Sequence, residues 1–454
     1  MNFIEKVRAA GIVGAGGAGF PTDVKLNAKA EYLIINAAEC EPLIETDKYI
    51  CREYAEEVVA GTLMAAEQIG AEKVVIALKA IYTPEIAALK AAINKAGAKI
   101  EISEMPTFYP AGDEQITVEF VTGRSVPERG LPLNVGVVVN NVGTMMNLYE
   151  AITEGKPVTN KFLSVTGEVA KTIMLNVPIG TSLRECVDKA GALIDDYAII
   201  VGGPMMGDVL TKKDDIDKAV VTKTTGNIIV LPKDHYLVTW STDSMEKLRH
   251  QTKSACIQCR MCTDLCPRYL IGHDIQPHLV MRNLWRENLI TDDQEYINCF
   301  GSALNCCDCR ICETFACPML LSPQKMNAYF KVQIREKGLD KPRNQEPTAR
   351  EGLDIRRVPT GRLVARLRLS KYYGKHVQEC IEFVPENVFI PFSQHIGKPA
   401  LAQVKVGDNV QKGQLIAAAQ EGISANIHSS VSGVVKEVSA QGALIHAEGG
   451  DNHK

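Results

Sequence analysis

Residues 256–267 read CIQCRMCTDLCP, and residues 306–318 read CCDCRICETFACP. The first run has the spacing Cys-x2-Cys-x2-Cys-x3-Cys-Pro, and the second has one more residue before its last cysteine. Ten of the fourteen cysteines in the chain fall between positions 256 and 317. The spacing within the two runs therefore indicates a metal-binding unit in this part of the chain.

The remaining composition is that of a multidomain globular protein. The 454 residues are 46% hydrophobic and 23% charged, and about 150 residues per domain predicts about three domains. A net charge of −4 provides no basic field that would attract nucleic acid. No apolar run approaches the roughly 18 residues of a membrane span, and the first residues lack the apolar core of a secretory signal. We therefore expect a cytoplasmic protein with no membrane span and no nucleic-acid partner.

In a reducing compartment disulfides are rare, so clustered thiols indicate metal ligands. The spacing of both runs is that of [4Fe–4S] sites in bacterial ferredoxins, where the fourth cysteine of each run binds the other cluster. The expected ligands of one cluster are Cys256, Cys259, Cys262 and Cys317, and those of the other are Cys306, Cys309, Cys312 and Cys266.

Structural zinc is the alternative, because zinc also binds four thiolates. Zinc sites usually show two separated cysteine pairs, whereas here each run has a triplet followed by Cys-Pro. A zinc-stabilised scaffold or binding protein stays open as a second reading. Cys299 and Cys307 lie outside the spacing, and we expect both to be buried small hydrophobes.

A second motif lies near the N-terminus, where residues 14–22 read GAGGAGFPT. A dinucleotide-binding fingerprint would need a strand directly before these glycines. The apolar residues of segment 3–10 instead recur at helical spacing, so we do not expect a Rossmann site. Such a loop still allows backbone N–H groups to approach a phosphate or a flavin closely.

Four motifs in order carry a specific resemblance: GAGGAGFPT (14–22), NAAECEP (36–42), YPAGDE (109–114) and VVVNNVGT (137–144). They resemble the flavin-binding domain shared by the C subunit of Rnf complexes and the NADH-binding subunit of respiratory complex I. The resemblance implies bound FMN with NADH as the electron donor, and places Glu41 and Glu114 near the nicotinamide. The FMN contacts that it implies are Gly14, Gly16, Gly17, Lys25, Asn36, Glu39, Asn140, Asn141 and Thr144.

The remaining segments resemble further modules of the same family. Residues 160–225 are similar to a β-grasp (SLBB) domain, and 386–448 resemble a barrel-sandwich hybrid that lacks the lysine of a biotinyl or lipoyl carrier. The fold class is thus multidomain, combining α/β, α+β, helical and all-β units. The expected domains are 1–155 (FMN and NADH binding), 156–240 (SLBB-like β-grasp), 241–335 (helical, with two [4Fe–4S] clusters), 336–380 (basic linker or arm) and 381–454 (barrel-sandwich hybrid).

The order of these modules narrows the resemblance. In the Rnf C subunit the sandwich precedes the flavin domain, whereas here it is C-terminal, as in the cobalamin reductases of propanediol-utilising bacterial microcompartments. That family implies an oxidoreductase that passes electrons from NADH through FMN and two [4Fe–4S] clusters to a corrinoid, reducing cob(III)alamin and cob(II)alamin to cob(I)alamin. It also implies a location inside a microcompartment, among lumen proteins, and an adenosyltransferase or another one-electron acceptor as partner.

No Ser-His-Asp set is recognisable, so we predict no catalytic side chain of the chain itself. An Rnf-like protein that reduces a ferredoxin, a flavodoxin or another one-electron acceptor stays open as the first alternative.

Overall fold

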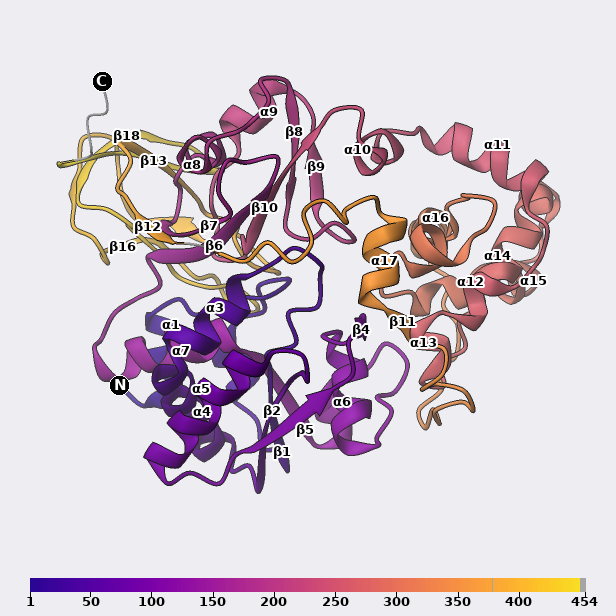
Figure 1. Ribbon diagram of the computed structural model, residues 1–454, viewed down its shortest axis with the longest axis horizontal. Coiled ribbons are helices and arrows are strands. Elements are labelled where there is room, and N and C mark those ends of the chain that lie inside the picture. Colours follow the sequence, from indigo (N-terminus) through magenta and orange to yellow (C-terminus); the bar gives the residue numbers. More distant parts are fainter. Residues whose placement is uncertain (378, 450–454) are drawn as a thin grey trace.

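The computed structural model describes residues 1–377 and 379–449. The predicted ranges 336–380 and 381–454 therefore include residues 378 and 450–454, which lie outside the described part. Figure 1 shows an N-terminal α/β unit, a β-sheet unit beside it, a C-terminal β-sandwich, and a helical unit at the opposite end of the molecule from the sandwich.

The first unit is a parallel sheet between two helical layers. All-parallel sheets need cover on both faces, and strand residues Leu33 and Ile35 pack toward one helical layer while Ile34 packs toward the other. The strand order is β3-β2-β1-β5. The strands are β1 (Tyr32–Asn36), β2 (Lys73–Lys79), β3 (Glu101–Met105) and β5 (Val137–Asn141). The helices are α1 (Phe3–Ala9), α2 (Thr22–Leu26), α3 (Thr46–Glu53), α4 (Ala55–Ile69), α5 (Thr83–Ala96), α6 (Glu114–Thr122), η1 (Pro132–Val135) and α7 (Val142–Thr153).

The glycine loop follows a helix and not a strand. The helical spacing of residues 3–10 is confirmed by α1, which begins after a capping box made by Asn2 and Glu5. A single bridge between Val13 and Pro21 closes the base of the loop. The absence of a Rossmann arrangement at this loop is therefore also confirmed.

The second unit is a mixed sheet with the order β12-β7-β6-β10-β8-β9. Its outer strand β12 comes from far along the chain and pairs in parallel with β7. The elements are β6 (Asn160–Gly167), β7 (Ile173–Pro178), α8 (Leu183–Ala190), β8 (Tyr197–Val201), β9 (Asp208–Leu210), α9 (Lys213–Lys218), β10 (Asn227–Pro232) and β12 (Cys380–Glu382).

The helical unit carries both cysteine runs. Its core includes the rings of Phe300 and Phe330, which stack with their centroids 3.8 Å apart. The elements are α10 (Tyr236–Ser241), α11 (Met245–Ala255), α12 (Met261–Asp264), α13 (Pro267–Leu270), α14 (Pro277–Asn283), η2 (Leu284–Leu289), α15 (Asp293–Phe300), η3 (Gly301–Asn305), η4 (Cys312–Ala316) and α16 (Pro323–Glu336).

The basic segment that follows is an ordered arm. Strand β11 (Val358–Pro359) pairs with β4 (Phe108–Tyr109) of the first unit, and α17 (Thr360–Arg366) follows it. Leu363 and Leu367 are buried in the same apolar cluster as Tyr109 and Cys309. The arm thus packs across the junction between the α/β unit and the helical unit.

Two small sheets form the C-terminal sandwich, with the orders β13-β19-β18-β15 and β14-β16-β17. Asn426 of the sandwich donates to the carbonyl of Arg8 (3.3 Å), so this unit docks on the N-terminal helix. The strands are β13 (Asn387–Pro391), β14 (Leu401–Ala402), β15 (Asn409–Val410), β16 (Leu415–Ala418), β17 (Ile427–His428), β18 (Gly433–Val438) and β19 (Gly442–Ala447).

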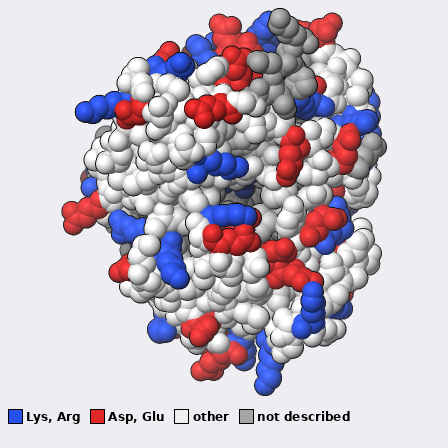
Figure 2. All heavy atoms as spheres, turned by 90° about the vertical axis from the view of Figure 1, so that its left-hand side faces the viewer, with Lys and Arg blue, Asp and Glu red and all other residues white. Residues whose placement is uncertain are grey.

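One face of the molecule shows no dominant charge (Figure 2). On the face shown in Figure 2, acidic and basic side chains are interspersed. Within residues 1–377 and 379–449, no helix is both long and apolar enough to cross a bilayer.

The stacked pair in the helical core gives a first prediction. Replacing Phe330, which is fully buried, by alanine opens a cavity, and we expect the free energy of unfolding to fall by about 3–5 kcal/mol. Val332→Ala is the matched control, because Val332 lies on the same helix and is 49% exposed. Urea unfolding followed by circular dichroism tests this, and equal midpoints for the two variants would contradict it.

Candidate flavin and iron–sulfur site

The carboxyl ends of β1 and β5 form the first part of the site. These two strands are neighbours in the parallel sheet, and open α/β sheets bind ligands beyond the carboxyl ends of their strands. Asn36 ends β1, and Asn141 ends β5 directly opposite it in the strand register. The motifs predicted to bind FMN are therefore gathered at this edge.

The glycine loop lies against the start of α7. Its Ala15 N–H donates to the hydroxyl of Thr144, which is fully buried (3.0 Å). A Cβ at Gly16 would lie 2.5 Å from the amide nitrogen of Asn141, so only glycine allows this approach, whereas Gly17 faces open space. The Gly14 N–H donates to Phe20 O (2.9 Å) and closes the loop.

Three further predicted residues meet beside this loop. The Lys25 ammonium donates to Glu114 Oε1 (2.7 Å) and to the carbonyl of Val139 (2.6 Å). The side-chain amide of Asn140 is buried, and its nitrogen has no hydrogen-bond partner among the residues that the structure describes. A buried unpaired donor is costly unless a ligand satisfies it, so this site fits a flavin with polar edges.

Behind the loop lies a buried polar network. Glu39 accepts hydrogen bonds from the backbone of Asp47 (2.6 Å) and Lys48 (3.3 Å), and Asp47 accepts one from the Asn141 amide (2.7 Å). Burial raises the pKa of both Glu39 and Asp47. Asn36 donates to Gly112 O (2.8 Å) and so ties the YPAGDE motif to the end of β1.

Glu41 points away from this group. Its carboxylate accepts a hydrogen bond from the backbone N–H of Met205 (2.8 Å), in the loop after β8 of the second unit. A Cβ at Gly203 would lie 2.3 Å from the Glu41 carboxyl carbon. Burial raises the pKa of Glu41 to about 7. Among the predicted flavin-site acids, Glu41 therefore holds two units together, while Glu114 stays with Lys25.

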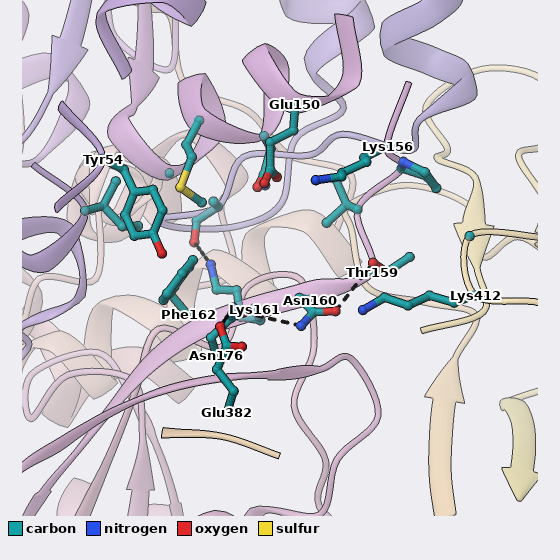
Figure 3. Close-up of a pocket in the computed structure, with 18 residues that line it drawn as sticks. Tyr54, Glu150, Lys156, Thr159, Asn160, Lys161, Phe162, Asn176, Glu382 and Lys412 are labelled. Atoms are coloured by element: carbon teal, nitrogen blue, oxygen red, sulfur yellow. Dashed lines mark hydrogen bonds between the residues drawn. The ribbon is translucent and has the colours of Figure 1, made fainter. Parts of the chain in front are cut away.

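A residue that the sequence did not single out also supports the glycine loop. Lys161 of β6 is buried, and its ammonium donates to the carbonyl of Ala15 (2.8 Å). Burial lowers its pKa to about 8. Lys161 also lines a cavity of about 530 Å³, into which Lys156 and Lys412 point from one side while Tyr54 and Phe162 form the other (Figure 3).

The two cysteine loops repeat one backbone conformation. In the first loop the residues on either side of the middle cysteine, Gln258 and Arg260, have φ of 57° and 67°. Their counterparts in the second loop, Asp308 and Arg310, have φ of 60° and 61°. Left-handed backbone at non-glycine residues costs about 1–2 kcal/mol each, so a shared requirement imposes this turn twice.

N–H groups in and near these loops donate to cysteine sulfurs. The backbone of Asp308 donates to Cys306 Sγ (3.4 Å), that of Leu321 donates to Cys317 Sγ (3.4 Å), and the Gln258 amide donates to Cys256 Sγ (3.1 Å). Hydrogen bonds to the sulfurs are part of how proteins tune iron–sulfur clusters. The loops therefore fit thiolate ligands.

The expected ligand cysteines of both runs lie near one another. Cys262 is within electrostatic reach of Cys256, Cys259 and Cys317, and also of Cys266. In the described ranges, no three His, Cys, Asp or Glu side chains are close enough together for a single metal ion. Cys299 is buried as predicted, whereas Cys307 is only half-buried. One small cavity is lined by Cys266, Cys306, Cys307, Cys309 and Cys312.

We call the edge of the sheet where the predicted FMN motifs gather the flavin edge. Two contacts join the second cysteine group to it. The buried hydroxyl of Tyr109 donates to the carbonyl of Cys309 (3.1 Å). Arg268, two residues after Cys266, pairs with Asp113 (2.9 Å). Tyr109 and Asp113 belong to a motif that the sequence did indicate, but nothing in the spacing identified Arg268 as their partner.

Four family models match the chain. They are the Nuo51 FMN-binding domain over residues 7–150, the SLBB domain over 162–209, the 4Fe-4S dicluster domain over 255–322 and the RnfC barrel sandwich hybrid domain over 371–449. The predicted fold class and the predicted cofactors, FMN and two [4Fe–4S] clusters, are thereby confirmed. The fold and the site define an oxidoreductase that contains flavin and iron–sulfur clusters.

Its relatives identify the family. The chain is 42% identical over 443 residues to "Cobalamin reductase PduS" of Salmonella typhimurium, covering 97% of this chain and 95% of that protein. It is 40% identical to the protein of the same name from Citrobacter freundii, with the same coverage. The C subunit of the "Na(+)-translocating ferredoxin:NAD(+) oxidoreductase complex" of Acetobacterium woodii is 36% identical over 61% of this chain and 60% of its own length. The chain belongs to the PduS cobalamin reductase family.

The contact between the glycine loop and α7 gives a second prediction. Thr144→Val keeps the side-chain shape but leaves the Ala15 N–H without an acceptor, a cost of about 1–3 kcal/mol. We expect the dissociation constant for FMN to rise about tenfold, measured by quenching of flavin fluorescence on titration into apoprotein. Thr153→Val is the control, because Thr153 lies on the same helix but bonds only within it; an unchanged FMN affinity in Thr144→Val would refute this role.

The raised pKa of Glu41 gives a third prediction. The folded chain holds this proton more tightly than the unfolded chain, so its stabilising effect is complete below pH 4.5 and disappears as the pH rises past about 7. Glu41→Gln keeps an acceptor for the Met205 N–H and removes the titration. Across this range, the denaturation midpoint should fall more in the unmodified protein than in Glu41→Gln; parallel pH profiles would contradict the prediction.

Proposed function

We propose that this protein is an NADH-dependent cobalamin reductase. The observation that carries the proposal is a hydrogen bond between the flavin edge and the cysteine loops. In it, the Tyr109 hydroxyl donates to the backbone carbonyl of Cys309. The names of the two relatives that match 97% of the chain support cobalamin as the acceptor. NADH is the donor implied by the resemblance to complex I.

When bound by the residues assigned below, FMN would supply hydride acceptance from NADH, and the two clusters would supply one-electron transfer. One NADH therefore gives NAD⁺, one proton and two electrons, which reduce two cob(II)alamin to two cob(I)alamin. The side chains bind and orient the cofactors and exclude water from them.

We assign the flavin contacts to the residues at the sheet edge. The unpaired Asn140 amide and the Lys25 ammonium donate to the ligand, and the glycine loop brings backbone N–H groups to it. Thr144 and Lys161 hold that loop from behind. Glu39 and Asn141 belong to the polar network beneath, and Glu114 keeps the Lys25 ammonium in place.

We assign the cluster ligands to the two groups of four cysteines. Cys256, Cys259, Cys262 and Cys317 form the outer group, in which Cys259 is exposed. Cys266, Cys306, Cys309 and Cys312 form the inner group, beside the flavin edge. The dicluster match over both runs favours iron–sulfur over zinc.

The family also supports a proposed partner and a proposed location for this protein. Because cob(I)alamin is a strongly reducing and short-lived product, a partner must capture it, and an adenosyltransferase is suited to that step. The family also suggests a location in the lumen of a bacterial microcompartment.

A second candidate is an Rnf-like electron-transfer protein that reduces a ferredoxin or a flavodoxin. The similarity to an Rnf C subunit over 61% of the chain favours it.

The test is anaerobic purification with measurement of iron, sulfide and flavin, followed by NADH-dependent formation of cob(I)alamin from cob(II)alamin. We expect two [4Fe–4S] clusters, FMN and cobalamin reduction. Cys309→Ser should lose most of the cobalamin reduction while NADH-dependent reduction of ferricyanide, which the flavin can perform alone, persists. Fast ferredoxin reduction without cobalamin reduction would favour the second candidate and refute the first.

A further inference from the structure

The two cysteine groups differ in their surroundings. In the inner group, Cys266, Cys309 and Cys312 are each at most 8% exposed. The loop that carries Cys309 accepts a hydrogen bond from Tyr109, and Arg268, in the helix after Cys266, forms an ion pair with Asp113. The arm then covers this junction. The inner group is thus enclosed between the flavin edge and the helical unit.

The outer group faces solvent. Every residue from 257 to 261 is exposed, including the ligand Cys259. The segment after Cys317 is also exposed and lies close by, because α12 contacts η4 and Cys317 lies within electrostatic reach of Cys262. Four large apolar side chains on these two segments are exposed, and we call them the collar: Ile257 (61% exposed), Met261 (41%), Met319 (42%) and Leu320 (53%).

The collar carries almost no charge. Within residues 256–262 and 317–320 the only charged side chain is that of Arg260. Its guanidinium is already paired with Asp264 (3.3 Å) and hydrogen-bonded to the Tyr269 hydroxyl (2.9 Å). Such a surface provides no electrostatic steering of a strongly charged redox protein toward it. Exposed apolar side chains grouped in this way are typical of a binding surface.

We propose that the collar is where the corrin ring of cobalamin docks to receive its electron. This inference rests on the proposed function. A corrin is a broad macrocycle with apolar faces and a rim of uncharged amides, so it matches an apolar surface with little charge. Docking there brings cobalt next to the one exposed ligand cysteine, where a single electron converts cob(II)alamin to cob(I)alamin.

The test compares two double variants of the holoenzyme. Ile257→Glu/Met319→Glu places two carboxylates in the collar, and burying them under a corrin is unfavourable. The matched control is Leu289→Glu/Ile355→Glu, at apolar side chains that are 70% and 85% exposed but lie outside the collar. Binding of hydroxocobalamin by equilibrium dialysis is the first readout. The others are the reduction of cob(II)alamin, ferricyanide, ferredoxin and flavodoxin, and the iron and flavin content.

We expect the collar variant to bind and reduce cobalamin about tenfold or more weakly, with normal ferricyanide reduction and normal iron and flavin. The control should match the unmodified protein. Unchanged cobalamin binding in the collar variant overturns the inference, as does loss of ferredoxin or flavodoxin reduction alone, which would assign the collar to a protein partner. If the unmodified holoenzyme neither binds nor reduces cobalamin, the proposed function itself fails.

Discussion

The buried ion pair between Arg268 and Asp113 is the contact on which the geometry of the site depends. Asp113 also caps α6 by accepting from the N–H groups of Gln115 and Ile116. One carboxylate therefore fixes both the helix that follows the YPAGDE motif and the segment that carries Cys266. Because both partners are largely buried, removing either one leaves an uncompensated charge, which is far more costly than losing a surface pair. The Tyr109–Cys309 hydrogen bond adds a second, neutral attachment beside it.

Buried lysines of the second unit provide a similar constraint on the glycine loop. Lys161 donates to Ala15 O within the loop, and Lys223 donates to Gly11 O before it (2.7 Å) and to Asn426 O of the sandwich (2.7 Å). Burial lowers the pKa of Lys223 to about 7. Carbonyl oxygens satisfy these ammonium groups without a carboxylate, so the loop is held by hydrogen bonds from outside its own domain. Contacts among the α/β unit, the second unit and the sandwich therefore hold the flavin edge in place.

Local sequence patterns predicted what depends on near neighbours. The helix near residues 3–10 follows from apolar periodicity, and the cysteine spacing follows from the reach of one short loop. Contacts between distant segments left no such signal: Lys161 reads as an ordinary strand residue and Arg268 as a surface charge. The basic composition of residues 336–380 predicts a linker or arm, but it does not indicate that Leu363 and Leu367 are buried against Tyr109 and Cys309. Glu41 stands in a flavin motif, yet its partner Met205 is in another domain.

The docking of the sandwich beside the chain's first helix has a consequence for the order of modules. A Cβ on Gly11 would meet the Asn426 carbonyl at 2.3 Å, and one on Gly19 would meet Gln394 O at 3.0 Å, so the last module is fitted to the first loop. Figure 1 shows the N-terminus on the same side of the molecule as the sandwich. The sandwich, which comes last among the described residues, thus packs against the first helix and the glycine loop, so a different order of modules along a chain is compatible with the same contacts.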